Sequence, residues 1–548
     1  MARTQRAVVL RYPPCVMAVI DLIDVSYAHP GGWTLFEGVT FRVPEGHRAA
    51  LIGANGIGKS TLLRVIAGLE PQRSGHINVP ERIGLMRQLI GSDAQPTTVR
   101  EFLLAYAERR VSDAGGRLVE AERALADRAD EKAQLAYANA LALWEEAGGY
   151  RAEVTWDVCT SAAFGQGYPE CAERHIETLS GGERKRLALE VLFRSDFDVL
   201  LLDEPDNFLD IEGKHWLEEQ MAASPKTILF VSHDRAVLAR TATRVLTLEA
   251  RGVWTHAGGY ATYGEAREAR LEQLEEEHRR YAEKHQHLVD NLRELKRRAA
   301  LNDKFASLAR SAEKKLTWFE ERETPRERPK EQNVKIGIAG GRTGKMALRI
   351  SGLSVPGMID PFDAEISFGE RIGVLGPNGT GKSHFLRLLV GEDVRHEGAF
   401  TLGARVQPGL FRQLHDRPDL VGEPMVEVLQ NRGMSMSEAM SLLKRYELAH
   451  VGRNPFEILS GGQQARLQLL LMEVECPTML LLDEPTDNLD VASADALEDA
   501  ILRYEGTVIA VTHDRWFMRM MDRFLFFEED GPVRELLESP YAAELAGV

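Results

Sequence analysis

Two stretches with the same pattern decide the fold: Gly53-Ala54-Asn55-Gly56-Ile57-Gly58-Lys59-Ser60-Thr61 and Gly376-Pro377-Asn378-Gly379-Thr380-Gly381-Lys382-Ser383-His384. Each follows a short apolar run and precedes an apolar stretch with helical spacing. In that context the glycines let backbone N–H groups turn toward a phosphate, and the helix N-terminus favours negative charge. We expect the two lysines to reach the β- and γ-phosphates and the serines after them to bind magnesium. The sequence therefore predicts two P-loops.

The P-loops belong to a long internal repeat. A Leu-Ser-Gly-Gly motif places Ser180 23 positions before Asp203, and a second places Ser460 23 positions before Asp483. Self-similarity at fixed spacing indicates two copies of one structural unit. The 548 residues also exceed what one hydrophobic core usually serves. We therefore predict an α/β protein with two nucleotide-binding domains.

An acidic pair ends a buried strand in each copy. The runs 199–202 and 479–482 are continuously apolar, as in parallel strands buried on both faces. At the carboxyl edge of such a sheet the first acid would lie beside the P-loop and hold magnesium, and the second would orient or deprotonate water. The metal-binding acids are Asp203 and Asp483, and the catalytic acids are Glu204 and Glu484.

Two histidines and two glutamines extend this set. His233 and His513 each lie 30 positions after the metal-binding aspartate and follow an apolar strand, where an imidazole could touch the γ-phosphate. A lone His-Asp is more often structural, but the repeated interval favours the functional interpretation. Gln88 and Gln413 are expected to contact the metal and the attacking water.

Composition restricts partners and compartment. The chain has 67 Lys and Arg against 83 Asp and Glu, a net charge of −16, so any nucleic-acid surface must be local. Its four cysteines form no CxxC pair, which argues against a zinc site and a disulfide framework. No apolar run approaches the ~20 residues that cross a bilayer. We expect a cytoplasmic protein that does not enter a membrane.

The segment between the repeats, residues 262–323, has a heptad pattern. Apolar residues recur at intervals of three and four before and after position 302, which predicts two helices folded back on each other. The first, about 38 residues at ~1.5 Å each, would extend roughly 57 Å. Residues 293–315 contain eight cations and three anions. This basic tip is compatible with nucleic-acid contact and, equally, with a solvated coiled coil that only spaces the domains.

The Ser-Gly-Gly motifs, together with the P-loops and acidic strands, resemble the ATP-binding cassette superfamily. There two cassettes pair head to tail, and each ATP lies between one P-loop and the signature motif of the opposite cassette. The resemblance implies a site one built from the first P-loop and second signature, and a site two built the other way round. It also implies that Asp210 and Asp490 meet across the seam. The signature residues would be Ser180, Gly181, Gly182, Ser460, Gly461, Gly462 and Gln463.

The two copies differ around the expected adenine. Tyr27 stands where the superfamily stacks an aromatic ring on the base, whereas the aligned residue of the second copy is Val355. His384 occupies the place of Thr61, so site two lacks that hydroxyl. We therefore expect the two sites to differ in affinity or turnover.

Tandem cassettes joined by a charged helical hairpin are similar to the ABC-F family. Its members bind the ribosome with ATP and push the hairpin toward the P-site tRNA and peptidyl-transferase centre; some are translation factors and others dislodge antibiotics. The tip, residues 301–306, resembles the antibiotic-protection branch, which favours resistance. The resemblance implies a monomeric, Mg²⁺-dependent ATPase. It assigns contacts with rRNA and tRNA to Arg293, Lys296, Arg297, Arg298, Asn302, Asp303, Lys304 and Phe305.

These motifs divide the chain into four parts. We predict an unstructured extension over 1–16, a first cassette over 17–261, a hairpin linker over 262–335 and a second cassette over 336–548. The start could be Met1 or Met17. A helical insertion at about 91–175 enlarges the first cassette, either as an arm that touches the ribosome or as a larger helical subdomain.

Two other classes of protein share some of these features. The soluble ATPase of a membrane transporter can be a tandem cassette, but it needs a permease partner, which this chain does not contain, and has no use for a basic hairpin. A DNA-maintenance ATPase would usually insert a far longer coiled coil or zinc-binding cysteines. The ribosome-acting ATPase is therefore preferred.

Overall fold

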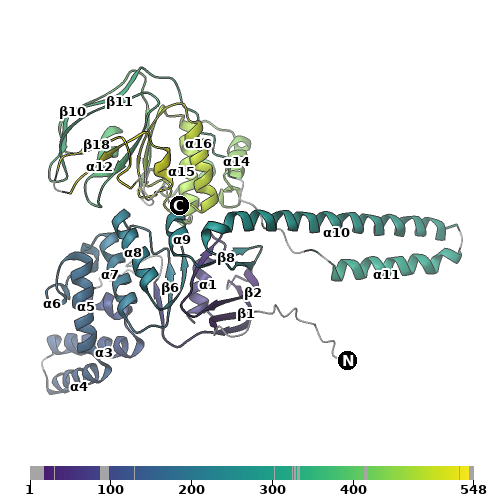
Figure 1. The fold of residues 1–548 in the computed structure, drawn as a ribbon, viewed down its shortest axis with the longest axis horizontal. Helices are drawn as coiled ribbons and strands as arrows, with labels where there is room; N and C mark the ends of the chain where they lie inside the picture. Colours follow the sequence, from purple (N-terminus) through teal and green to yellow (C-terminus); the bar gives the residue numbers. More distant parts are fainter. Residues whose placement is uncertain are drawn as a thin grey trace.

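Two α/β cassettes face each other, and a long helical hairpin projects from between them (Figure 1). The computed structural model describes residues 18–541 except 30, 87–97, 129, 302, 324, 326–328, 330–333, 413–416 and 530. Gln88, Gln413 and Asn302 therefore lie outside the described residues, and the Asp303 side chain is likewise not described.

Cassette one is built on a six-stranded sheet in the order β5-β6-β7-β3-β8-β9, flanked by a three-stranded antiparallel sheet. The five strands β5, β6, β7, β3 and β8 run parallel, and β9 is antiparallel. β6 and β7 are buried along their whole length, in keeping with their apolar sequences. The strands are β1 (Ala18–Ala28), β2 (Thr34–Pro44), β3 (Arg48–Ile52), β4 (Ser74–Asn78), β5 (Ile83–Met86), β6 (Val199–Asp203), β7 (Thr227–Val231), β8 (Arg244–Glu249) and β9 (Gly252–His256).

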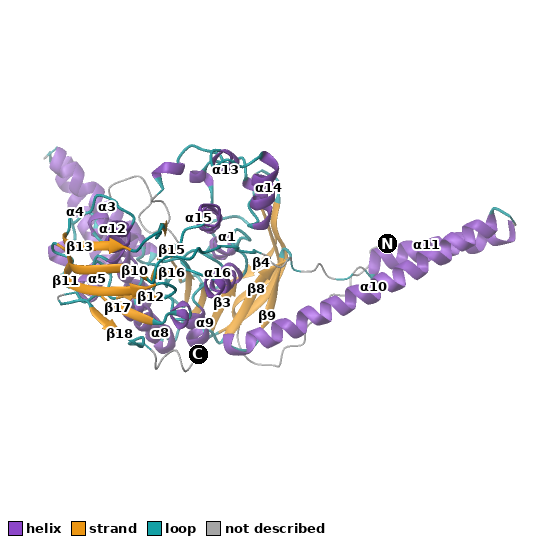
Figure 2. Cartoon of the chain, turned by 90° about the horizontal axis from the view of Figure 1, so that it is seen from above, coloured by secondary structure: helices purple, strands orange, loops and turns teal. Residues whose placement is uncertain are grey.

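The helices of cassette one form two groups. One group covers the main sheet, and the other, α2 to α6, forms a helical subdomain around the fully buried ring of Trp144. α3 and α4 lie at the end of the molecule opposite the hairpin (Figure 2). The helices are α1 (Lys59–Ile66), α2 (Val99–Ala105), α3 (Arg109–Asp127), α4 (Glu131–Ala147), α5 (Gly149–Phe164), α6 (Tyr168–Cys171), α7 (Gly181–Arg194), α8 (Ile211–Ala223) and α9 (Arg235–Thr241), with η1 (Ile176–Thr178).

Cassette two repeats this architecture with a smaller helical subdomain. Its main sheet has the order β14-β15-β16-β12-β17-β18, which matches the sheet of cassette one strand for strand. Its elements are β10 (Met346–Val355), β11 (Ile359–Ser367), β12 (Arg371–Leu375), β13 (Glu397–Leu402), β14 (Pro408–Phe411), β15 (Met479–Asp483), β16 (Thr507–Val511), β17 (Arg523–Phe526), β18 (Arg534–Leu536), α12 (Lys382–Leu389), α13 (Met425–Gln430), α14 (Met436–Arg445), α15 (Gly461–Glu475), α16 (Val491–Arg503), η4 (Pro418–Leu420), η5 (Ala449–Val451), η6 (Phe456–Ile458) and η7 (Phe517–Met520).

The predicted hairpin is present. After η2 (Tyr260–Thr262), α10 (Tyr263–Ala299) runs outward, η3 (Asp303–Phe305) turns the chain, and α11 (Ala306–Arg322) returns along it (Figure 1). The Tyr281 and Phe319 rings stack between the helices with centroids 4.9 Å apart. Lys284 Nζ also donates to Glu323 Oε2 at 2.6 Å. Apolar stacking and ion pairs between α10 and α11 therefore stiffen a probe of 37 residues on its longer side.

Candidate functional site

Both P-loops have the expected strand–loop–helix setting. Gly58 and Gly381, just before α1 and α12, have positive φ of 109° and 86°. A Cβ on Gly58 would lie 2.7 Å from the Leu35 side chain, so both conformation and space require glycine there. Lys59 Nζ donates to the Gly53 carbonyl at 2.7 Å, and Lys382 Nζ donates to the Gly376 carbonyl at 2.8 Å. Both ammonium groups are folded into their loops, where phosphate oxygens could replace the carbonyls.

The expected metal-binding residues lie together in each cassette. Ser383 Oγ donates to Asp483 Oδ1 at 3.1 Å, and the equivalent Ser60 hydroxyl hydrogen-bonds Asp203. Burial raises the pKa of Asp203, and its Oδ1 has no hydrogen-bond partner. A hydroxyl beside a buried carboxylate with a free oxygen suits a hard cation such as Mg²⁺, since oxygen donors are its preferred ligands. Among the described residues no cluster of three or more His, Cys, Asp or Glu suggests another metal.

The predicted catalytic glutamates lie close to the two predicted histidines, His233 and His513, which we call the switch histidines. His233 Nε2 lies 3.9 Å from Glu204 Oε1, and His513 Nε2 lies 3.5 Å from Glu484 Oε1. Burial lowers the pKa of both histidines, that of His233 to about 3, so both rings are neutral at physiological pH. Glu204 and Glu484 have positive φ of 49° and 46°. This uncommon backbone conformation occurs at the same point of both copies, as is typical of functional sites.

Each P-loop touches the opposite cassette. In site one, the Asn55 backbone N–H donates to Asp490 Oδ2 at 3.1 Å, and Asn55 Nδ2 donates to the Asn488 carbonyl at 2.8 Å. A Cβ on Gly462 of the signature would lie 2.2 Å from Asn55 Nδ2. The P-loop of cassette one is thus packed directly against the signature and the following loop of cassette two.

Site two has the corresponding contacts. Asn378 Nδ2 donates to the Phe208 carbonyl at 3.0 Å, and a Cβ on Gly182 would lie 3.4 Å from that nitrogen. Ser180 begins α7 with a capping box closed by Glu183. At α15, the Ser460 backbone N–H donates to Gln463 Oε1 at 3.0 Å. The two cassettes are therefore arranged head to tail, and the residues expected for two composite sites face each other.

Asp210 and Asp490 each cap a helix beside the seam between the cassettes. Asp210 caps α8 by accepting from the Gly213 N–H at 2.8 Å, and Asp490 caps α16 by accepting from the Ser493 N–H at 3.0 Å. Asp490 also accepts from the Asn55 N–H of the opposite P-loop, and the Asp210 carboxylate interacts electrostatically with Lys382 of the other P-loop. Their approach to each other across the seam stays a prediction.

Tyr27 packs inside cassette one. Its side chain is buried, its ring stacks on Phe36 with centroids 5.8 Å apart, and its hydroxyl donates to Glu70 Oε2 at 2.8 Å. Tyr27 thus belongs to the apolar interior beside the three-stranded sheet β2-β1-β4, here called the β-subdomain, and stacking of adenine on its ring stays a prediction. The exposed aromatic side chain nearby is Trp33, whose ring lies 4.4 Å from that of His29.

The equivalent corner of site two is a cavity of about 400 Å³. Val355, His384 and Arg387 contribute to its lining. His384 lines this cavity. The equivalent residue of site one, Thr61, is instead buried, and its hydroxyl accepts a hydrogen bond from Arg64 Nη2 at 3.2 Å. The two sites differ at the position where the sequences differ.

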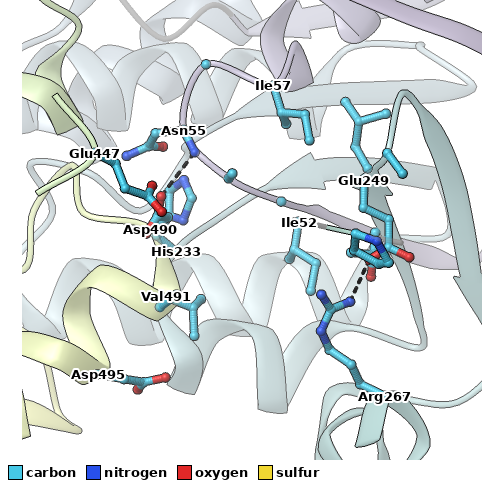
Figure 3. A pocket seen from close by; sticks show the side chains of 18 of the residues that line it. Ile52, Asn55, Ile57, His233, Glu249, Arg267, Glu447, Asp490, Val491 and Asp495 are labelled. Atoms are coloured by element: carbon cyan, nitrogen blue, oxygen red, sulfur yellow. Dashed lines mark hydrogen bonds and ion pairs between the residues drawn. The ribbon is translucent and has the colours of Figure 1, made fainter. Parts of the chain in front are cut away.

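A larger cavity of about 1380 Å³ lies between the cassettes, lined by the first P-loop and by residues of cassette two that include Gln463 and Asp490. Figure 3 shows Asn55 bonded to Asp490 on one side of this cavity and Arg267 of α10 bonded to Glu249 on the other. The base of the hairpin therefore forms a wall of the same cavity as the nucleotide loop of site one.

The charged residues near the hairpin tip are exposed but engaged within the hairpin. Lys296 Nζ pairs with Glu313 at 2.7 Å, and Arg297 and Arg298 both pair with Glu294. Arg293 lies 3.5 Å from Asp290. Phe305 has the Arg298 guanidinium 6.0 Å from its ring centroid. Lys304 is exposed.

Several seam residues were not anticipated from sequence. Asn207 Nδ2 donates to Glu204 Oε2 at 2.7 Å, whereas the equivalent residue of site two is Asp487. Lys214 of α8 is buried and bonds both Asp234 at 2.9 Å and the His513 carbonyl at 3.2 Å. The sequence signals these residues only by a difference between the two copies: the residue equivalent to Lys214 is Ala494, just as the residue equivalent to Asn207 is Asp487.

Comparisons with known proteins agree with this arrangement. Residues 36–207 and 359–487 match the family described as "ABC transporter". The chain is 45% identical to an "Antibiotic resistance protein" of Mycobacteroides abscessus over 95% of this chain and 99% of that protein. It is 34% identical to the "Tylosin resistance ATP-binding protein TlrC" of Streptomyces fradiae, with 89% and 92% covered.

A solved structure supports the fold alone. The protein named "RNase-L Inhibitor" matches with a TM-score of 0.53 at 20% identity, over 94% of this chain and 90% of that one. Among the described helices, none combines the length and apolarity needed to cross a membrane. With two head-to-tail ATPase cassettes and a helical hairpin between them, the chain belongs to the ABC-F family of ATP-binding cassette proteins.

Proposed function

We propose that this protein is a ribosome-acting ATPase that confers antibiotic resistance by ribosome protection. ATP-driven closure of the cassettes would push the hairpin toward the P-site tRNA and peptidyl-transferase centre. The observation that carries this proposal is the 45% identity, over nearly the whole chain, to a protein named for antibiotic resistance. The basic, stiffened hairpin tip gives that activity a physical means of contacting RNA.

Hydrolysis would use the same groups at both sites. Lys59 and Lys382 would bind the β- and γ-phosphates, and the signature helices α15 and α7 would present their N-termini to the γ-phosphate from the opposite cassette. Glu204 and Glu484 would orient and accept a proton from the attacking water. The neutral imidazoles of His233 and His513 would hold that carboxylate and the γ-phosphate in place.

We propose that each site uses Mg²⁺. Ser60 with Asp203, and Ser383 with Asp483, would hold it, with Gln88 and Gln413 as further ligands. When bound, the ion would neutralise charge on the β- and γ-phosphates. The protein residues would keep the carboxylate and hydroxyl oxygens oriented and the site free of competing cations.

Contacts at the hairpin base support coupling to the clamp. α9 begins directly after His233 and Asp234, and it contacts η2 at the start of the hairpin. Tyr263, the first residue of α10, is buried and its hydroxyl hydrogen-bonds Thr247 of β8 at 3.1 Å. Arg267 and Arg270 of α10 both pair with Glu249 at the end of β8. The hairpin would therefore move with cassette one as one rigid lever when the clamp closes.

We further propose four parts: the extension 1–16, cassettes 17–261 and 336–548, and the linker 262–335. The pairing of both cassettes within one chain favours a monomer. We place the protein in the cytoplasm because its proposed site of action is the ribosome. The helices α2 to α6 of cassette one would be either an arm that touches the ribosome or a larger helical subdomain.

Ribosome co-sedimentation tests the proposal. The doubly substituted Glu204→Gln, Glu484→Gln protein should pellet with ribosomes in ATP and stay in the supernatant in ADP, because hydrolysis can no longer reopen the clamp. Expression in a susceptible host should raise the inhibitory concentration of at least one ribosome-targeting drug. Ribosome binding without any change in susceptibility would indicate a translation factor, and recovery only with membranes would indicate a transporter ATPase.

The hairpin offers a matched pair of variants. Arg297 and Arg298 share Glu294 near the tip, whereas Arg279 and Arg280 share Glu276 about five turns closer to the base. Replacing both tip arginines with Gln should weaken ribosome binding and reduce its dependence on salt, because each lost phosphate contact removes counterion release. Replacing Arg279 and Arg280 with Gln should leave ribosome binding and its salt dependence nearly unchanged. Equal effects of the two double variants would make the hairpin a spacer.

A further inference from the structure

Two arginines cross the seam in the same way. Arg235 and Arg515 each follow a switch histidine and an aspartate, in a His-Asp-Arg triplet that repeats at an interval of 280 residues. Arg235 of cassette one donates through Nη1 to Glu498 Oε2 at 3.4 Å, and Nη2 donates to the other oxygen. Arg515 of cassette two makes the same two contacts with Glu218, Nη1 to Oε2 at 3.3 Å. Glu218 and Glu498 are themselves 280 residues apart, so the two ion pairs are equivalents.

Each arginine is held in position before it reaches across. Asp234 caps α9 by accepting from the Ala236 and Val237 N–H groups, and Asp514 does the same for the Trp516 and Phe517 N–H groups. These hydrogen bonds fix the backbone around Arg235, the first residue of α9, and around Arg515; we call each His-Asp-Arg triplet a switch segment. Bidentate Arg–carboxylate pairing adds directional specificity to charge attraction.

The acceptor helices connect these arginines back to the nucleotide loops. Glu498 lies on α16, whose N-cap Asp490 accepts from Asn55 of the first P-loop. α16 is thus fixed to cassette one at two points, by Arg235 beside His233 and by Asn55, and both points flank site one. Glu218 lies on α8, which follows the Phe208 carbonyl that binds Asn378 of the second P-loop.

We infer that Arg235 and Arg515 are positioning residues that form an inter-cassette latch, defined by the pairs Arg235–Glu498 and Arg515–Glu218. The latch ties each switch segment to α16 or α8, the helix of the opposite cassette whose preceding loop contacts the P-loop of the same ATP site. Closure at the γ-phosphate and docking of that helix then occur together, because the switch segment and the helix are joined at both ends. The inference rests on the ATPase activity of the proposed function and is independent of ribosome binding.

The two halves of the latch differ in burial. The Arg515 and Glu218 side chains are 2% and 7% exposed, and Glu218 also accepts from Arg240 at 3.1 Å. The Arg235 half is nearer solvent, since its second partner Asp495 is 57% exposed. Removing one partner of a buried pair leaves an uncompensated charge, so Arg515 is the harder residue to replace without unfolding. Arg235 is therefore the better test.

The experiment compares Arg235→Ala, Glu498→Arg and the swapped Arg235→Glu, Glu498→Arg protein in full-length form. Arg235→Ala should lower kcat for ATP about tenfold with little change in KM, because the latch acts on closure after ATP binds. The swapped protein should recover kcat to within about threefold of wild type, whereas Glu498→Arg alone, which places two arginines together, should be as slow as Arg235→Ala or slower. A charge swap in the surface pair Arg349–Glu365 outside the seam, 3.2 Å apart, is the control and should be silent.

Hydrogen exchange supplies a readout that a general loss of stability would not produce. In the Glu204→Gln, Glu484→Gln background with ATP, Arg235→Ala should speed exchange in residues 488–498 at the start of α16, and leave the start of α8 protected. Wild-type kcat and unchanged exchange in Arg235→Ala, or a swapped protein no faster than its parents, would overturn the latch. Failure to bind ribosomes with these results intact would refute the proposed function and leave the latch standing.

Discussion

The two ATP sites of this protein share their framework and differ in the residues around it. Both have a lysine folded into the P-loop, a serine beside a buried aspartate and a histidine near the catalytic glutamate. Site one adds an amide donor, Asn207, to its glutamate. Site two has an acid, Asp487, at that position, and burial together with the charges of Asp487 and Asp483 raises the pKa of Glu484 to about 8.

The repeat therefore keeps the residues that are expected to touch phosphate, whereas the residues packed around them differ between the two copies. Lys214 of cassette one also bonds the His513 carbonyl of site two across the seam. The equivalent residue on α16, Ala494, can make no such bond to site one. A duplicated fold can therefore hold two sites with one chemistry and unequal rates. Variants that exchange the differing residues measure how unequal they are.

The largest effect is expected from the catalytic glutamates. Replacing both with Gln should reduce ATP turnover by about 10²- to 10⁴-fold, because a positioned general base contributes a factor of that size to the rate. Glu204→Gln alone should cost more turnover than Glu484→Gln alone, since site one has the amide donor and the threonine hydroxyl. Steady-state phosphate release measures all three. Equal residual rates in the single variants would remove the asymmetry.

Lys214→Met tests the buried charges on the site-two side. Loss of this ammonium group would leave Asp234 without its closest partner in a buried setting, so we expect the free energy of unfolding to fall by about 3 kcal/mol. Ala494→Met, at the equivalent position of α16, is the matched comparison: it adds volume at a buried site without removing a charge and should cost about 1 to 3 kcal/mol. Calorimetry provides the comparison.

A double variant separates charge from packing in that result. Lys214→Met combined with Asp234→Asn removes both the cation and its main anion, and should regain part of the lost stability. If the double variant were less stable than the sum of the single changes, Lys214 would act through its aliphatic stem and its bond to the His513 carbonyl.

Asn207 and Asp487 can be exchanged directly. In a Glu204→Gln background, where only site two turns over, Asp487→Asn should raise the rate about fivefold by replacing a repelling anion with an amide. In a Glu484→Gln background, Asn207→Asp should lower the rate of site one by a similar factor. Opposite signs in the two backgrounds are the prediction, and a loss of rate in both would mean that each residue is fitted to its own site.

Most of the framework could be predicted because it follows from local patterns. Apolar strands that end in Gly-rich loops or acidic pairs reveal both the fold and the residues beside phosphate, and heptads reveal the hairpin. The Ser383–Asp483 bond joins two such local patterns at one sheet edge. The roles of the nucleotide residues themselves stay predictions until ligand-bound protein is measured.

The remaining features depend on contacts between residues that are distant in sequence. Nothing near Arg515 identifies Glu218, 297 positions away, as its partner. Tyr27 lies at the end of a strand, and only packing against Phe36 and Glu70 determines that its ring turns inward. The bond between Asp490 and Asn55 likewise joins residues 435 positions apart, and no local pattern indicates it.

The smallest effect is expected at His384. His384→Thr would restore the side-chain type of Thr61, and in the Glu204→Gln background it should raise ATP affinity of site two about two- to threefold, through one added hydrogen bond of ~0.5 kcal/mol net. The reverse change, Thr61→His in the Glu484→Gln background, should weaken site one more strongly, because Thr61 is buried and a larger ring must displace its neighbours. Nucleotide titration by fluorescence measures both. If neither substitution changed affinity, the difference between the sites would lie at residues near the catalytic glutamate, such as Asn207 and Asp487, and not near the adenine.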